Sequence, residues 1–226
     1  MLVHVPAVLS AQETSRFCGR LAGAPWGDGR VTAGPQSGVV KHNQQLPQDC
    51  VEARELGDQV LSALDHAPLF LSGALPARVF PPLFNRYAEG MDFGAHIDNA
   101  IRRVPGSRLS IRTDLSVTLF LNPPDGYDGG ELVIEDTYGV QSVKLAAGDM
   151  VLYPATSRHR VMPVTRGQRL ACFFWVQSLV KDDAERSMLF ELDRAIQFLS
   201  ADNQNHPEIL RLTGLYHNLV RKWGAP

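Results

Sequence analysis

One stretch near the middle of the chain carries the residues around which the rest is arranged: Asn85-Arg86-Tyr87-Ala88-Glu89-Gly90-Met91-Asp92-Phe93-Gly94-Ala95-His96-Ile97-Asp98-Asn99. In an extended chain, residues two apart leave the same face, so His96 and Asp98 aim an imidazole nitrogen and a carboxylate oxygen at one point. A divalent metal held by two histidines and one carboxylate needs one further histidine. A surface turn is the alternative, because a single His-x-Asp is a common pattern.

His159 is the candidate for the third ligand. The turn residues Thr165-Arg166-Gly167 separate two strand-like runs. A hairpin centred there places His159 opposite Ala171, with Arg169 on the same face roughly 7 Å along the strand. A slip of one residue would put the two on opposite faces. In the predicted register a short dicarboxylate can chelate the metal at one end and pair with Arg169 at the other.

The region around these residues predicts a β-rich core. Between Leu115 and Leu121, Leu and Val alternate with Ser, Thr and Phe, and turns rich in Gly, Pro and Asp separate the further runs. Such strands predict an antiparallel sandwich or barrel, and strands that carry metal ligands fit a double-stranded β-helix, or jelly roll. The run from Arg169 to Val176 is apolar on both faces, as in a fully buried strand. A buried arginine needs an anionic partner, which is either an acidic side chain or, as we prefer, a ligand.

The conspicuous residues of the chain form an ordered set: Asn85-Arg86-Tyr87, Gly90, His96-x-Asp98, Gly129-Gly130-Glu131-Leu132, Gly148-Asp149, Tyr153-Pro154, His159-x-Val161-x-Pro163-Val164, Gly167-x-Arg169 and Trp175. In this order they resemble the Fe(II)/2-oxoglutarate-dependent dioxygenases of the prolyl-4-hydroxylase superfamily. The resemblance covers essentially the whole chain. It is strongest to the bacterial PKHD-type hydroxylases (the YbiX/PiuC group).

The resemblance implies a function and a set of site residues. Fe(II) is expected on His96, Asp98 and His159, with 2-oxoglutarate bound through Arg169. Tyr87 is a further candidate for contacting the cosubstrate, with an ordinary core tyrosine as the alternative. The implied reaction uses O2, releases succinate and CO2, and hydroxylates an unidentified small-molecule or peptidyl substrate. L-Ascorbate is implied as the reductant that keeps the iron ferrous.

Two rival functions come from other classes. One is a non-catalytic jelly-roll sensor of a metal or small ligand, and the other is a cupin-type enzyme that uses zinc or manganese. Neither rival needs an arginine at the spacing of Arg169 from His159, so this residue favours the dioxygenase.

The flanking segments predict helices. Ser10 and Glu13 fit a capping box for a helix to about Leu21, and an amphipathic pattern spans residues 51–64. A short strand is expected near residues 30–32, an exposed loop rather than a pocket border at 39–45, and a basic loop at 99–110 that contacts substrate or is simply solvated. We expect helical support in 1–75, the core in about 76–178 and the dioxygenase domain in 1–178.

Residues 179–226 form the expected C-terminal helical extension. Its two apolar stripes either pack on the barrel or join two subunits in a homo-oligomer.

Composition narrows the class of protein. The 226 residues are 44% hydrophobic and 20% charged with a net charge of −2, which is ordinary for one globular domain and gives no basic surface for nucleic acid. The N-terminus lacks the pattern of a signal peptide, and no apolar run reaches the length of a membrane span. Three widely spaced cysteines fit reduced thiols. We therefore expect a cytoplasmic protein.

Overall fold

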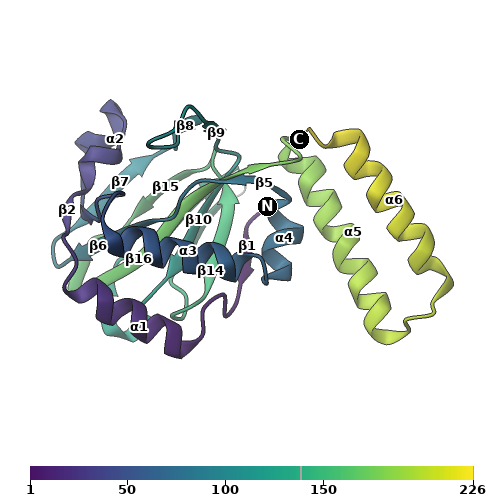
Figure 1. The fold of residues 1–226 in the computed structure, drawn as a ribbon, viewed down its shortest axis with the longest axis horizontal. Helices are drawn as coiled ribbons and strands as arrows, with labels where there is room; N and C mark the ends of the chain where they lie inside the picture. Colours follow the sequence, from purple (N-terminus) through teal and green to yellow (C-terminus); the bar gives the residue numbers. More distant parts are fainter. Residues whose placement is uncertain (138, 226) are drawn as a thin grey trace.

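The computed structural model describes residues 1–137 and 139–225, and it contains two antiparallel sheets with helices around them (Figure 1). The strands of the larger sheet in these residues are β1 (Val3–Val5), β2 (Gly27–Asp28), β4 (Gln44–Gln45), β5 (Pro76–Val79), β6 (Leu83–Ala88), β10 (Leu115–Phe120), β11 (Tyr127–Gly129), β14 (Met150–Pro154) and β16 (Val164–Ser178). Their order is β1-β14-β10-β16-β6-β4-β2, with β5 and β11 also paired to β16.

The smaller sheet has the order β13-β12-β15-β7-β3. Its strands are β3 (Lys41–His42), β7 (Asp92–His96), β12 (Leu132–Asp136), β13 (Gly139–Val143) and β15 (Arg158–Val161). A separate hairpin joins β8 (Ile101–Arg103) to β9 (Ser110–Arg112). The helices are α1 (Ala11–Ala22), α2 (Pro35–Val39), α3 (Val51–Leu64), α4 (Pro68–Ala74), α5 (Asp183–Asp202) and α6 (Pro207–Trp223), with short 3₁₀ turns at Gly29–Thr32 and Pro124–Gly126.

Strand β10 shows how the larger sheet separates the core from the cavity. Leu115, Val117 and Leu119 pack with side chains of α1 and α3, such as Phe17 and Leu56, which lie across this face of the sheet (Figure 1). The alternate side chains of β10 point the other way, toward the smaller sheet. One face of the larger sheet is therefore a dry core, and the opposite face borders a cavity between the sheets.

The mainly β architecture with N-terminal and C-terminal helices confirms the predicted fold class. Helix α1 begins with the expected capping box, in which Ser10 and Glu13 each accept from the other's backbone N–H. Helix α3 spans Val51–Leu64, the bounds that its apolar stripe predicts. The break between β5 and β6 falls at Pro81-Pro82, where two ladder donors are missing.

The predicted hairpin between the strands of His159 and Arg169 is wrong. Strand β15 belongs to the smaller sheet and β16 to the larger one, so His159 pairs with Ile134 and His96. Ala171, its predicted partner, instead pairs with residues of β6 and β10. The chain crosses between the sheets at Pro163, which has no N–H to donate to a hairpin ladder.

The structure also corrects three predictions for short segments. Residues 30–32 lie in a 3₁₀ turn rather than a strand. The segment 39–45 is not an exposed loop, because it contains β3 and β4 and buries Lys41, Asn43 and Gln45. The basic segment 99–110 contributes to the β8–β9 hairpin rather than forming an irregular loop.

The C-terminal helices form a hairpin that projects from the sheets (Figure 1). Helices α5 and α6 pack against each other, and α5 also packs against α4. Leu189 of α5 is buried in a small cluster with Leu75 and Val180. No helix of the described residues is both long and apolar enough to cross a membrane.

A pair of glycine substitutions tests the packing at the start of β14. Gly148 has φ +92°, and a Cβ there would lie 2.1 Å from the Leu9 carbonyl oxygen. Gly148→Ala should therefore lower the free energy of unfolding by about 2 kcal/mol or more in urea titrations. Gly19→Ala in α1 is the matched control: a Cβ there meets no atom within 4 Å, so this change should stabilise by up to ~1 kcal/mol. Equal effects from the two variants would contradict this packing.

Candidate metal centre

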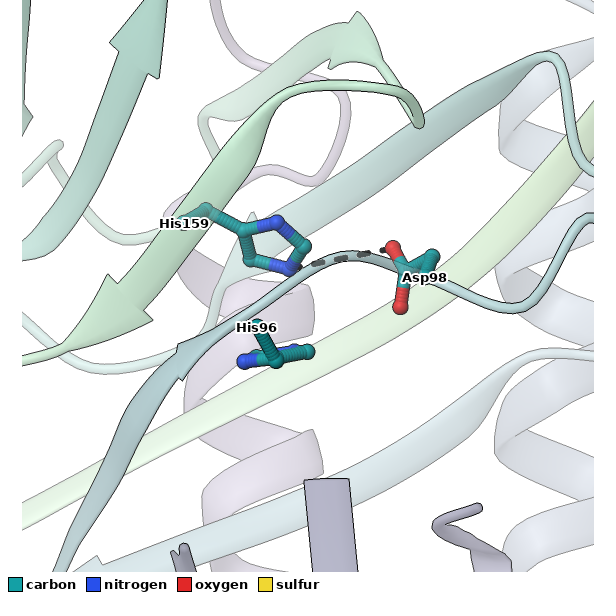
Figure 2. A group of neighbouring side chains, drawn as sticks. All are labelled: His96, Asp98 and His159. Carbon is teal, nitrogen blue, oxygen red and sulfur yellow. Dashed lines mark ion pairs between the residues drawn. The ribbon is translucent and has the colours of Figure 1, made fainter. Parts of the chain in front are cut away.

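Two histidines from neighbouring strands face each other across the smaller sheet. His96 is the last residue of β7 and pairs directly with His159 on β15, and their ring centroids are 4.2 Å apart. Asp98 lies two residues beyond the end of β7, with Oδ2 3.7 Å from His159 Nε2 (Figure 2). One ligand atom from each of the three side chains lies within 4.8 Å of the other two. The three residues predicted from sequence thus converge on one point.

Hydrogen bonds orient all three side chains. His96 Nδ1 donates to the Gly94 carbonyl at 2.8 Å, and His159 Nδ1 donates to the Ser157 carbonyl at 3.0 Å. A carbonyl only accepts, so each neutral ring carries its proton on Nδ1 and keeps a lone pair on Nε2. The Ser116 hydroxyl of β10 donates to Asp98 Oδ2 at 2.5 Å. These contacts select the tautomer and rotamer that a metal needs.

Burial keeps His96 in its neutral form. Its ring stacks on Phe93 with centroids 3.6 Å apart, and Tyr153 meets the His159 ring edge-on at 5.2 Å. Desolvation, followed by the nearby His159, lowers the pKa of His96 to about 4. The imidazole is therefore unprotonated at neutral pH and available as a ligand.

Arg169 is a buried cation without an ion-pair partner in the described part of the chain. Its side chain is 1% exposed, and its Nε has no hydrogen-bond partner. The guanidinium carbon lies 5.4 Å from the ring centroid of Tyr87 and 5.2 Å from that of Phe120. No described carboxylate lies within the 4.0 Å of a salt bridge to Arg169. This arrangement suits an anionic ligand, which would offset the cost of burying the charge.

Gly130 makes room for Arg169. Its φ is +68°, and a Cβ at this position would lie 3.1 Å from Arg169 Cδ. The turn glycine therefore has two roles, because it adopts a left-handed backbone and lets the arginine side chain pass close by.

Tyr87 lies beside Arg169 at the same cavity. The two residues pair across β6 and β16, and the tyrosine is 1% exposed. Burial raises the pKa of Tyr87 to about 12, so its hydroxyl remains a hydrogen-bond donor at neutral pH.

One cavity between the sheets is lined by all five residues singled out in the sequence, His96, Asp98, His159, Arg169 and Tyr87. Its wall also includes Ser116, Lys41 and Arg102, which sequence reasoning either missed or placed in a loop. Ser116 gave no signal beyond a polar position in an alternating strand. Lys41 sits in a two-residue strand, which is too short for a periodic pattern to reveal.

Comparison with known families agrees with this site. Residues 82–177 match the 2OG-Fe(II) oxygenase superfamily, and residues 183–225 match the PKHD-type hydroxylase C-terminal domain. A PKHD-type hydroxylase of Pseudomonas putida is 60% identical over 99% of both chains. The PKHD-type hydroxylase PiuC of Pseudomonas aeruginosa is 59% identical, again over 99% of both chains.

Solved structures share the fold at low sequence identity. A prolyl hydroxylase from Trichoplax adhaerens, in complex with a hypoxia-inducible-factor peptide fragment, aligns with a TM-score of 0.59 and 14% identity over 83% of this chain and 86% of that one. A Pseudomonas putida prolyl-4-hydroxylase aligns with a TM-score of 0.51 and 20% identity over 78% and 92%. HygX from Streptomyces hygroscopicus, with nickel and 2-oxoglutarate bound, has a TM-score of 0.52 and 14% identity over 78% and 82%.

Identity near 60% along the full length establishes the family, and the family establishes the reaction class. The chain belongs to the PKHD-type hydroxylases and is an Fe(II)-dependent oxygenase that uses O2 and 2-oxoglutarate as cosubstrates.

Proposed function

We propose that His96, Asp98 and His159 hold the Fe(II) ion of this hydroxylase and that Arg169 binds the far carboxylate of 2-oxoglutarate. One observation carries this assignment: ligand atoms of the three side chains lie within 4.8 Å of one another, in the same cavity as an arginine whose buried Nε has no partner. Two imidazoles and one carboxylate are the donor set of non-haem Fe(II) oxygenases, and they leave coordination positions open.

Bound Fe(II) and 2-oxoglutarate would supply the oxidation, in which one oxygen atom of O2 enters succinate, CO2 is released and the other atom becomes the substrate hydroxyl. The protein's own contribution is orientation. Ser116 restrains Asp98, and the carbonyls of Gly94 and Ser157 restrain the two imidazoles. Tyr87 is proposed to donate a hydrogen bond to the cosubstrate, and L-ascorbate is expected to sustain turnover by keeping the iron ferrous.

Residues 1–178 are proposed to form the oxygenase domain, with its core at about 76–178, and 179–226 an added helical extension. The separate family matches at 82–177 and 183–225 support this division.

The two rival functions are disfavoured. A sensor or a cupin-type zinc or manganese enzyme has no need of a buried arginine beside the metal ligands. The family match also favours the oxygenase over both.

Succinate release from 2-oxoglutarate tests the activity. Protein loaded with Fe(II) without oxygen and then exposed to air should release succinate above the level of an Asp98→Ala variant. Equal release from the two proteins, in a wild type shown to bind iron and 2-oxoglutarate, would contradict the proposed site.

Metal affinity tests the three ligands. Asp98→Ala should abolish binding of Mn(II) or Fe(II) at micromolar metal in anaerobic calorimetry. Ser116→Ala should weaken binding by roughly 10-fold, because it removes the hydrogen bond that restrains the carboxylate. His217→Ala, an exposed histidine on α6, is the control and should bind as the wild type does. Wild-type affinity in Asp98→Ala would remove this residue from the site.

Cosubstrate affinity tests Arg169. Arg169→Met should raise the dissociation constant of 2-oxoglutarate by roughly 100-fold, because a buried carboxylate loses its charged partner. Gly130→Ala should raise it by a smaller factor, since the new methyl group displaces the arginine. The control is Arg166→Met, which removes an exposed arginine of β16, the strand that also carries Arg169; Arg166 pairs with Asp128 of β11. Unchanged affinity in Arg169→Met would reject the assignment.

The pH dependence of stability tests the environment of His96. The folded protein holds the His96 pKa at about 4 against an ordinary value of 6.5. Between pH 6.5 and 4, His96 is therefore protonated in the unfolded chain but not in the folded protein. The free energy of unfolding should fall as the pH drops through this range. In metal-free protein the loss should be about 3 kcal/mol. His96→Gln should flatten this dependence and His217→Gln should not; identical profiles for both would refute the buried neutral imidazole.

A further inference from the structure

Two cations from distant parts of the sequence meet at Thr32 beside the metal ligands. Lys41 Nζ donates to the Thr32 hydroxyl at 3.1 Å, and Arg102 Nη2 donates to the Thr32 carbonyl at 3.0 Å. Lys41 belongs to β3 in the smaller sheet, whereas Arg102 belongs to the β8–β9 hairpin. Both side chains line the cavity that holds His96, Asp98 and His159.

Neither cation has an acidic partner among the described residues. Lys41 is 4% exposed, and its other hydrogen bond goes to the neutral Gln45 Oε1 at 3.1 Å. Arg102 Nε is buried without any hydrogen-bond partner. No described carboxylate lies within 4.0 Å of either side chain. Buried charges are ordinarily paired, so two unpaired cations side by side indicate a missing anion.

The pKa of Lys41 reflects its burial and its cationic neighbour. Burial, and then Arg102, lower this pKa to about 8, although the charges of Asp98 and Asp28 act in the opposite direction. The ammonium therefore remains largely protonated at neutral pH while repelling a second cation.

Aromatic rings surround the two cations. Lys41 Nζ lies 5.3 Å from the ring centroid of Phe93 and 5.8 Å from that of Phe173. The Arg102 guanidinium carbon lies 4.0 Å from the Trp175 centroid, a stacking distance. Phe93 in turn stacks on His96, which places this group next to the metal ligands.

This group is separate from the arginine proposed to bind 2-oxoglutarate. Arg169, Phe173 and Trp175 all lie on β16, and all three line the cavity. Residues four and six apart on a strand are separated by roughly 13 and 20 Å. Lys41 and Arg102 pack against Phe173 and Trp175, so they are too far along the strand to serve the carboxylate at Arg169.

The charges of the cavity leave an excess of positive charge. Asp98 is the sole carboxylate among the described lining residues, against Lys41, Arg102 and Arg169. A ferrous ion and a doubly charged 2-oxoglutarate cancel each other. The loaded cavity would thus hold two positive charges more than negative ones, which favours an anionic substrate over a neutral or cationic one.

We propose that Lys41 and Arg102 bind an anionic group, a carboxylate or phosphate, of the molecule that is hydroxylated, with its apolar part against Phe173 and Trp175. This assignment of a substrate class rests on the proposed metal and cosubstrate site. The substrate is then a small, partly apolar acid anchored at one end, with a C–H bond presented to the metal centre. Arg102 supplies a planar fork of donors and Lys41 a compact charge, a combination suited to an oxyanion.

The experiment uses probe acids of known chemistry. Benzoate, phenyl phosphate and the neutral benzamide are titrated into Mn(II)-loaded protein at saturating 2-oxoglutarate, and paramagnetic broadening of the probe resonances is measured by NMR. Benzoate, phenyl phosphate or both should be broadened, which marks binding beside the metal, whereas benzamide should not. Whichever anion binds identifies the group that the site prefers.

Variants assign the binding to the two cations. Arg102→Met should weaken binding of the anionic probe by at least about 10-fold, and Lys41→Met should do the same. Arg103→Met is the matched control, because it removes the same charge from the exposed neighbour of Arg102. Calorimetry should give unchanged 2-oxoglutarate affinity in all three variants. If Lys41→Met fails to fold, Arg102→Met and Arg102→Gln on the hairpin still decide the outcome.

Several results would overturn the proposal. These are equal binding of benzamide and the anions, wild-type affinity in Arg102→Met, or binding of the anions only when 2-oxoglutarate is left out, which would place them at Arg169. If the proposed metal and cosubstrate site itself is wrong, the result is distinguishable, because the wild type would then bind no Mn(II) or 2-oxoglutarate. Saturation-transfer NMR in metal-free protein would still report whether the anion depends on Arg102.

Discussion

The antiparallel pairing of β7 with β15 is the constraint on which the site depends. It places His96 directly opposite His159, although the two residues are far apart in the sequence. Backbone hydrogen bonds set this register, and the Nδ1 bonds to the Gly94 and Ser157 carbonyls then set the rings. A shift of one residue would turn one imidazole to the other face of the sheet. Strand pairing therefore positions the ligands before any metal binds.

The cavity between the sheets differs from the rest of the interior, because buried cations without ion-pair partners among the described residues line it. One face of the larger sheet is an apolar core covered by α1 and α3, where hydrophobic side chains pack together. The cavity on the opposite face is lined by Arg169 of this sheet, Lys41 of the smaller sheet and Arg102 of the β8–β9 hairpin, which have few internal partners. Such charges cost stability in the absence of ligands, and anions in the cavity would recover that cost. The unpaired cations therefore lower the stability of the ligand-free protein, and they make the cavity suited to binding anions.

Local patterns predicted several of the longer elements. The capping box of Ser10 and Glu13, the amphipathic stripe of α3 and the alternation in β10 are all short-range signals, and each corresponds to an element of the structure. The hairpin between His159 and Arg169 was wrong because Pro163 directs the chain from one sheet to the other. The pocket lining at Lys41 was missed because a strand of two residues has no periodicity.

The sequence alone determined the fold class, the family and the candidate residues, because residue types, turn chemistry and motif order are properties of the linear chain. Tertiary structure decided which side chains meet. Arg169 of the larger sheet lines the same cavity as the proposed metal ligands, Ser116 reaches Asp98 from the larger sheet, and Lys41 meets Arg102 at Thr32. Each contact joins residues from different sheets or hairpins. Their distances follow from long-range strand pairing and sheet packing, which no local pattern encodes.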